Sequence, residues 1–277
     1  MCFDVESRKV LNFGYITFAP LTNFNQINMK KLLCLFGALA LVLTSCSSDD
    51  SSSSSDLVLL KKTVITSPEG DKATVNFKYD GNKIVSVTDD TGFFNLYYTY
   101  TGDLISKIDY KLPNGKSEQV DTFTYTNDGK LSTFLRVEYE EEEGVAVLRG
   151  YKEVYTYNAD GTISVKGYSG SDVSQTVASG TATIKFVNGE VSEIISSNSP
   201  NHKYTYDNKN NPTKNILGMD KIAFVDGEAN GVKFNILTDT SDGNLWTNST
   251  FTYNEQGYPT KEVDNGSDSL GTTEYFY

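Results

Sequence analysis

The sequence predicts an all-β fold, an antiparallel up-and-down meander of about eight hairpins that curls into a barrel or a strongly bent sheet. From Leu57 onward, an aromatic–x–aromatic pair recurs, followed each time by a turn with Gly or Asn and then by an apolar return segment. The stretches between these units show no helical period of 3.6 residues. We therefore expect residues 57–277 to form one all-β repeat domain.

The repeat units share this pattern along the whole domain. In chain order they are FKYDGNKIVSV (77–87), YTYTGDLISKI (98–108), FTYTNDGKLSTF (123–134), YTYNADGTISV (155–165), IKFVNGEVSEI (184–194), YTYDNKNNPTKNI (204–216) and FTYNEQGYPTKEV (251–263). The segment 222–234 is a degenerate unit, and EYFY (274–277) is a last strand without a return. These units predict sixteen or seventeen strands.

Each unit has the pattern of a half-buried hairpin. Phe123 and Tyr125 are two residues apart and share one face of a strand, whereas Thr124 projects to the other face. Turns such as NDG and VNG contain residues that accept a positive φ, which allows a tight reversal of the chain. Leu131 and Phe134 in the return segment are three residues apart, so either a β-bulge separates them or one of them faces outward.

A meander of this length is expected to curl or close, because open twisted sheets rarely exceed about 10 strands. Strands that span a membrane need about 9–11 residues and an outward apolar band. The segment KATVNFKYD (72–80) instead places Lys, Thr and Asn on its wet face. We therefore do not expect this barrel to span a membrane.

Residues 29–46, MKKLLCLFGALALVLTSC, have the features of a secretory signal. A Met and two Lys precede an apolar run, which ends in small residues. The run from Leu32 to Leu43 is too short to cross the hydrocarbon core as a helix, which needs roughly 20 residues. LTSC (43–46) resembles a bacterial lipobox, and this resemblance implies a signal peptide over 29–45, lipidation of Cys46 and a lipid anchor in the membrane.

Two assignments concern the residues around this signal. Residues 1–28 precede a signal that should be N-terminal, so we interpret them as a mis-assigned extension, with a genuine extension as the alternative. Residues 46–56 form a Ser/Asp-rich tether. The acidic stretch in this tether also resembles the export signal of Bacteroidetes-type surface lipoproteins, and a simple linker is an equally open interpretation.

The pattern Y-x-Y-(D/N)-x-x-G-x-(L/I) in these units resembles the YD repeat of RHS-type proteins. Together with the lipobox, the chain resembles a Bacteroidetes-type family of outer-membrane lipoproteins of unknown function with a porin-like β fold. The resemblance covers most of residues 75–277. It implies an outer-membrane lipoprotein that faces the periplasm or the cell surface, and it brings no catalytic residues with it.

Composition excludes several classes of function. The formal net charge is −12, and such a surface repels phosphate backbones, so nucleic acid is not an expected partner. The three Cys residues lie within the first 46 positions, and His202 is the single His of the chain. Catalysis by a Cys–His pair and metal sites with several His ligands are therefore excluded. We expect no catalytic residues, no metal and no cofactor.

Other polar segments fit structural roles. His202 follows Pro200 and is expected to be a surface histidine in a loop, and the run Glu140–Glu143 is expected to be a solvated loop. The Asp- and Asn-rich segments 158–162, 207–211 and 239–244 contain oxygen ligands suited to calcium. None of them completes an EF-hand loop, so turn chemistry explains them better.

These observations predict a membrane-anchored, non-catalytic extracytoplasmic binding module whose ligand is a glycan, a peptide or a protein. The alternative is a structural or assembly component of an envelope complex. Most Tyr and Phe residues of the repeats should pair across strands and fill the core. Trp246 lies in GNLWTN, which departs from the repeat, and it is the candidate ligand-binding side chain.

Overall fold

The structure is a computed structural model that describes residues 57–92, 95–142, 145–267, 269 and 271–277. The predicted extension (1–28), signal peptide (29–45) and tether (46–56), including Cys46, lie outside the described residues, so these assignments stay predictions. Among the described residues, no helix has both the length and the apolar character required to cross a membrane.

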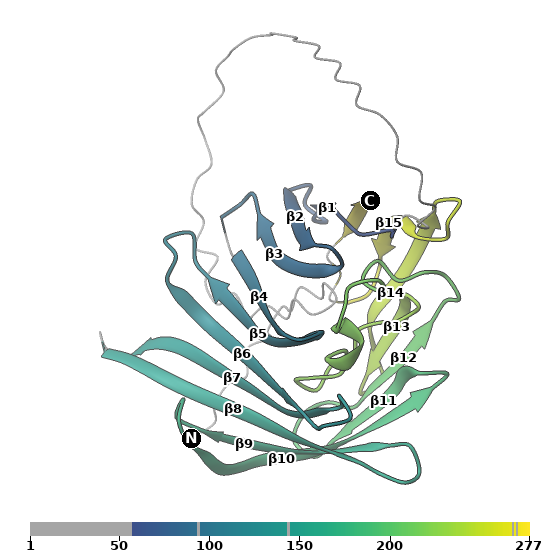
Figure 1. The fold of residues 1–277 in the computed structure, drawn as a ribbon. Helices are drawn as coiled ribbons and strands as arrows, with labels where there is room; N and C mark the ends of the chain where they lie inside the picture. Colours follow the sequence, from purple (N-terminus) through teal and green to yellow (C-terminus); the bar gives the residue numbers. More distant parts are fainter. Residues whose placement is uncertain (1–56, 93–94, 143–144, 268, 270) are drawn as a thin grey trace.

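Sixteen antiparallel strands form a closed barrel in which each strand pairs with its neighbours in sequence (Figure 1). The last strand pairs with the first, from Lys62↔Phe276 to Thr66↔Thr272, and this pairing closes the sheet. The predicted all-β meander is confirmed, and of the two predicted forms the barrel is the one observed. The strands are β1 (Lys62–Thr66), β2 (Lys72–Asp80), β3 (Lys83–Asp89), β4 (Asn95–Thr101), β5 (Leu104–Lys111), β6 (Ser117–Tyr125), β7 (Leu131–Glu142), β8 (Val145–Tyr157), β9 (Ile163–Gly170), β10 (Gln175–Val187), β11 (Glu190–Ser196), β12 (His202–Tyr206), β13 (Ile236–Ser241), β14 (Asn244–Tyr253), β15 (Pro259–Asp264) and β16 (Thr272–Phe276).

Apolar side chains fill the lumen of the barrel, and polar side chains cover much of its outer wall. Phe123 is 3% exposed and stacks on Phe134 with ring centroids 5.5 Å apart, whereas Thr124 between Phe123 and Tyr125 is exposed. The alternation predicted for the repeat is therefore confirmed. Exposed polar side chains recur on the other strands, for example Asn76, Lys78, Thr99, Lys166, Lys203, Thr250, Thr252 and Glu274.

The irregular spacing in the return segments is a β-bulge. In the β6–β7 hairpin the register passes from Thr124↔Thr133 to Tyr125↔Leu131, which leaves Ser132 unpaired. Leu131 and Phe134 thus both face the lumen although they are three residues apart. The same shift occurs beside the second aromatic of the hairpins β2–β3, β4–β5, β10–β11 and β14–β15. Bulges bend and twist a strand, which helps a sheet to close.

Hydroxyl groups of the second aromatics connect neighbouring hairpins at these bulges. The Tyr125 hydroxyl donates to the Ile105 carbonyl at 2.6 Å, and the Tyr206 hydroxyl donates to the Val191 carbonyl at 2.7 Å. Both carbonyls belong to the residue beside the bulge of the preceding hairpin. The conspicuous Y-x-Y signature therefore supports the architecture of the barrel.

Residues 207–235, between β12 and β13, enter the lumen, and we call them the plug segment (Figure 1). The segment holds the 3₁₀ helix η1 (Met219–Lys221), and its apolar side chains join the core, with Ile222 fully buried. The two hairpins predicted at 204–216 and 222–234 are therefore wrong. Asp207 explains the departure, because its carboxylate accepts hydrogen bonds from the backbone N–H groups of Lys209 and Asn235 and so closes the segment on itself.

The plug segment is fixed to the wall by buried polar contacts. Arg136 on β7 donates to Asp226 of the plug at 2.7 Å and lies 3.4 Å from Asp121 on β6. Glu190 on β11 is 2% exposed, and its carboxylate accepts three backbone N–H groups of the plug. The Leu217 N–H donates to the Asn82 carbonyl in the β2–β3 turn. The plug thus covers the lumen at the end of the barrel where the repeat turns lie.

Candidate functional site: a cavity in the barrel lumen

A cavity of about 160 Å³ lies between the plug segment and the wall formed by β2–β4 and β12–β16. Its apolar lining includes Phe77, Ile84, Val87, Ile216 and Met219. Most of its polar lining comes from the plug and from the strands near the chain's C-terminus. Those polar and aromatic residues include Tyr98, Tyr204, Asn211, Thr213, Glu228, Asn230, Asn235, Asp239, Trp246, Thr247, Phe251, Glu262, Asp264, Thr273 and Tyr275.

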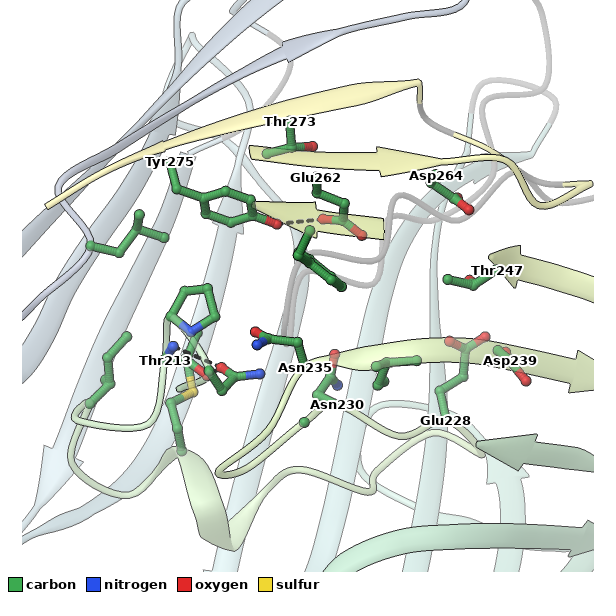
Figure 2. Close-up of a pocket in the computed structure, with 18 of the residues that line it drawn as sticks. Thr213, Glu228, Asn230, Asn235, Asp239, Thr247, Glu262, Asp264, Thr273 and Tyr275 are labelled. Carbon is green, nitrogen blue, oxygen red and sulfur yellow. Dashed lines mark hydrogen bonds between the residues drawn. The ribbon is translucent and has the colours of Figure 1, made fainter. Parts of the chain in front are cut away.

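Four carboxylic acids line this cavity. Figure 2 shows Glu262 and Asp264 on one side and Glu228 and Asp239 on the other. Among the described residues that line the cavity, none is Lys or Arg. The lining therefore favours positive charge and disfavours anions.

Glu262 lies on β15 and is partly buried. Its carboxyl group accepts hydrogen bonds from Ser249 Oγ at 2.6 Å and from the Tyr275 hydroxyl at 2.5 Å. Burial raises the pKa of Glu262, and these two donors only partly oppose that shift. Asp264 accepts the backbone N–H groups of Asn248 and Gly266 at 2.8 and 2.9 Å, so it also fixes the local backbone.

Trp246 lies on the wall of this cavity, as the residue displaced by a β-bulge. The register between β13 and β14 passes from Asp239↔Thr247 to Thr240↔Leu245 and leaves Trp246 without a partner. Bulges re-aim side chains in this way. The indole is partly buried and meets the His202 ring edge-on, with centroids 5.5 Å apart. A role for Trp246 in ligand binding stays a prediction.

His202 is not the surface residue in a loop that the sequence suggested. It lies on β12, is 5% exposed, and its Nδ1 is 3.0 Å from the Asp239 carboxylate. Burial lowers the pKa of His202, but the hydrogen bond and charge of Asp239 outweigh it and raise the pKa overall. Ser241 pairs with His202 in register, yet its buried hydroxyl has no hydrogen-bond partner, so no Ser–His–Asp relay is formed.

Tyr98 on β4 is one of the residues around the cavity, and its hydroxyl is buried in the protein. The side chain is 8% exposed, and its hydroxyl makes no hydrogen bond. The hydroxyls of Tyr79 and Tyr125 differ, because they donate to backbone carbonyls at 2.7 and 2.6 Å. A buried hydroxyl without a partner costs free energy, so this position carries a local cost in stability.

A second buried polar centre holds the plug on the opposite wall. Burial raises the pKa of Asp121 to about 6, although Arg136 opposes the shift. Burial, together with the charge of Asp226, raises the pKa of Glu153 on β8 to about 7. Glu153 accepts hydrogen bonds from the Tyr155 hydroxyl and from the Asp226 N–H. This centre serves as an attachment point for the plug, and the raised pKa values of Asp121 and Glu153 lie close to neutral pH.

The other predicted polar segments have structural roles. Glu140 does not lie in a loop, because β7 extends to Glu142, and Glu140 pairs with Arg149 on β8 at 2.5 Å. In 239–244, Asp242 and Gly243 adopt positive φ of 46° and 85° and form the tight turn between β13 and β14. Within the described part of the chain, no group of His, Cys, Asp and Glu is arranged to hold a metal ion.

Reasoning from the sequence missed the carboxylates of the cavity. Glu228 lies in a segment that was predicted as a degenerate hairpin, and Glu262 was assigned only to a return strand. One signal was present in the sequence. Glu262 and Asp264 are two residues apart, so they share a face of β15, and that face is the one opposite the exposed Lys261.

No protein-family model matches the chain, and no curated protein matches it in sequence. Among solved structures, a porin-like protein from Bacteroides vulgatus ATCC 8482 is similar in fold, with a TM-score of 0.52 and 13% identity over 79% of this chain and 98% of that one. A porin-like protein from Bacteroides uniformis ATCC 8492 has a TM-score of 0.46 and 14% identity over 78% of this chain and 97% of that one. The first likeness supports a porin-like β fold.

Proposed function

We propose that this protein is a lipid-anchored, non-catalytic binding barrel of the cell envelope, and that it holds a small ligand, or a small part of a larger one, in its lumen. The observation that carries this proposal is the cavity of about 160 Å³, which is lined by aromatic rings, amides and carboxylates. Ligand sites typically combine an apolar lining with a few placed polar groups. A monosaccharide unit of a glycan or one side chain of a peptide has a suitable size.

The distribution of polar residues supports a barrel that stands outside the bilayer. A membrane-spanning barrel carries an apolar band outside and polar side chains inside. Here the apolar residues fill the lumen, and exposed Lys and Thr side chains such as Lys78, Thr99, Lys166, Lys203 and Thr250 cover the wall. A lipid anchor at Cys46, followed by the Ser/Asp-rich stretch 46–56, would then supply the membrane attachment.

The experiment uses the single tryptophan of the chain as a reporter inside the site. The full chain in detergent is titrated with monosaccharides, amino-acid amides and small amines while Trp246 fluorescence and calorimetric heat are recorded. Saturable binding that changes both signals supports a lumenal site. A Trp246→Phe variant should weaken the calorimetric binding, whereas Tyr97→Phe on the exposed outer wall should not. Absence of saturable binding across the panel would refute the proposal.

The alternative, an assembly component of an envelope complex, is favoured by one feature of the surface. The long hairpins β7–β8 and β9–β10 point their turns to the same end of the barrel, as the pair Gly150↔Gly170 shows. Val145, Val173 and Val177 near these turns are 64%, 85% and 63% exposed. Crosslinking in intact cells, with and without Val173→Lys, tests this alternative, because a docked partner would be lost in the variant.

A further inference from the structure

We propose that the lumenal cavity selects a small organic cation, with a protonated amine placed between the acids of β15 and those of the plug and β13. The inference rests on the proposed function and adds the chemical class of the ligand. A site of this kind differs from a neutral sugar site because binding should require the positive charge of the ligand. The acids concerned are Glu228, Asp239 and Glu262.

The charge balance of the lining points to a cation. His202 offsets Asp239, since its Nδ1 lies 3.0 Å from that carboxylate. Glu262 is hydrogen-bonded only to neutral donors, Ser249 and Tyr275. Glu228 adds a further carboxylate whose charge acts on both His202 and Tyr204. The lining thus holds more acids than bases, and a cation bound beside these partly buried carboxylates would offset this excess.

Size and aromatic lining limit the ligand further. A cavity of roughly 150 Å³ lined by apolar groups accommodates a benzene ring, and this one measures about 160 Å³. Trp246, Tyr204 and Phe251 contribute aromatic rings to its lining. Faces of such rings attract cations within about 6 Å of the ring centre. A one-ring or short-chain primary amine therefore fits the volume, the charge and the aromatic lining.

The test compares two probes of nearly equal shape, benzylamine and benzyl alcohol, on the full-length wild-type chain at neutral pH. Benzylammonium is expected to bind at least tenfold more tightly by calorimetry and to change Trp246 fluorescence. This comparison needs no variant, so a misfolded mutant cannot obscure it. Equal affinities for the two probes, or tighter binding of galactose than of either, would overturn the cation inference and leave the lumenal binding function intact. Binding of no probe would overturn both.

One substitution locates the charge. Glu228→Gln should weaken benzylammonium binding roughly tenfold and leave benzyl alcohol unchanged. Glu274→Gln removes the same charge from the exposed outer face of β16 and should change neither affinity. Unchanged amine affinity in Glu228→Gln, with folding confirmed by circular dichroism, would contradict the proposal.

Discussion

The same aromatic signature begins two very different structures in this barrel. FTYTNDGKLSTF (123–134) forms a tight hairpin between β6 and β7, whereas YTYDNKNNPTKNI (204–216) leaves the wall after β12 and enters the lumen. In both places the second aromatic faces the core and its hydroxyl bonds to the preceding hairpin. The aromatic pair therefore determines the strand and its inward face but does not determine the path of the chain beyond that strand.

The residues after the aromatic pair account for the difference. Gly129 adopts a φ of 75° in the first unit, so the chain reverses at once. The second unit has no Gly at the equivalent place, and its Pro212 has no N–H with which to pair in a return strand. Asp207 and Asn211 instead accept hydrogen bonds from nearby N–H groups of their own segment. The wall is thus built from local turns, whereas the plug depends on distant buried contacts.

The largest test of this contrast removes Arg136. Arg136→Leu should lower the free energy of unfolding by about 3–5 kcal/mol, because it leaves Asp121 buried without its ionic partner. Arg136 also contacts Asp226 of the plug. Hydrogen exchange should therefore accelerate most at residues 222–231, while the β2–β5 amides stay protected. Urea denaturation measures the stability, and Lys203→Met on the exposed outer wall is the control.

If the wall and the plug lost protection together in Arg136→Leu, the plug would be an integral part of the core and the contrast between the two regions would fail. Selective exposure of the plug would instead show that it can detach from a closed barrel. Limited proteolysis, followed by identification of the cleaved bonds, distinguishes these outcomes.

The second prediction concerns pH, because burial raises the pKa values of Asp121 and Glu153 in the polar centre that holds the plug. Glu153 titrates at about 7 in the folded chain and near 4.5 when unfolded, so its stabilising contribution is complete below about pH 4.5 and is lost as the pH rises through 7. Asp121, with a pKa of about 6, acts in the same direction, as do the raised pKa values of His202 and Glu262. Stability should fall between pH 5 and pH 8.

The change of unfolding free energy with pH gives a test for the contribution of Glu153. One excess proton in the folded state corresponds to about 1.4 kcal/mol per pH unit, or about 3 kcal/mol in all for this group. Glu153→Gln should flatten the profile of unfolding free energy between pH 5 and pH 7 by this amount. A profile of equal slope in wild type and variant would show that Glu153 stays ionised in the folded chain.

Much of the wall could be predicted from the sequence, because neighbouring residues along the chain determine its strands and turns. Alternation at Phe123, Thr124 and Tyr125 predicts one buried face, and that face is the one observed. The bulge at Ser132 was one of two open interpretations, since the spacing of apolar residues cannot distinguish a bulge from an outward side chain. The number of strands predicts that the sheet curls or closes, but it does not give the register in which β1 pairs with β16.

The cavity could not be predicted in this way, because its residues come from segments far apart in the chain. The contact between His202 and Asp239 spans 37 positions, and that between Arg136 and Asp226 spans 90. No periodic pattern encodes such pairs. Trp246 was singled out because its segment departs from the repeat, and the structure places it at a bulge on the cavity wall. Departures from the repeat therefore indicated the region of the site but not its chemistry.

The third prediction concerns the second attachment of the plug. Glu190→Ala should cost about 2 kcal/mol, because three backbone N–H groups at Val232, Lys233 and Phe234 lose a charged acceptor. Those three amides should exchange faster with solvent than in wild type. Glu193→Ala on the same strand is the matched control. Glu193 pairs with Lys185 on β10 and Lys203 on β12, and neither lysine belongs to the plug segment. Comparable effects of the two substitutions would argue against a specific attachment at Glu190.

The smallest expected effect tests the repeat itself. Tyr125→Phe removes the hydroxyl that donates to the Ile105 carbonyl at 2.6 Å, and it should lower the free energy of unfolding by about 1 kcal/mol. Tyr98→Phe is the internal comparison, because the Tyr98 hydroxyl has no partner and its loss should be neutral or slightly stabilising. Both are Tyr-to-Phe changes at barrel-facing positions, so the difference between them isolates the hydrogen bond. If Tyr125→Phe were as neutral as Tyr98→Phe, the hydroxyls of the Y-x-Y pairs would not be what joins one hairpin to the next, and the apolar rings alone would account for the recurrence of the motif.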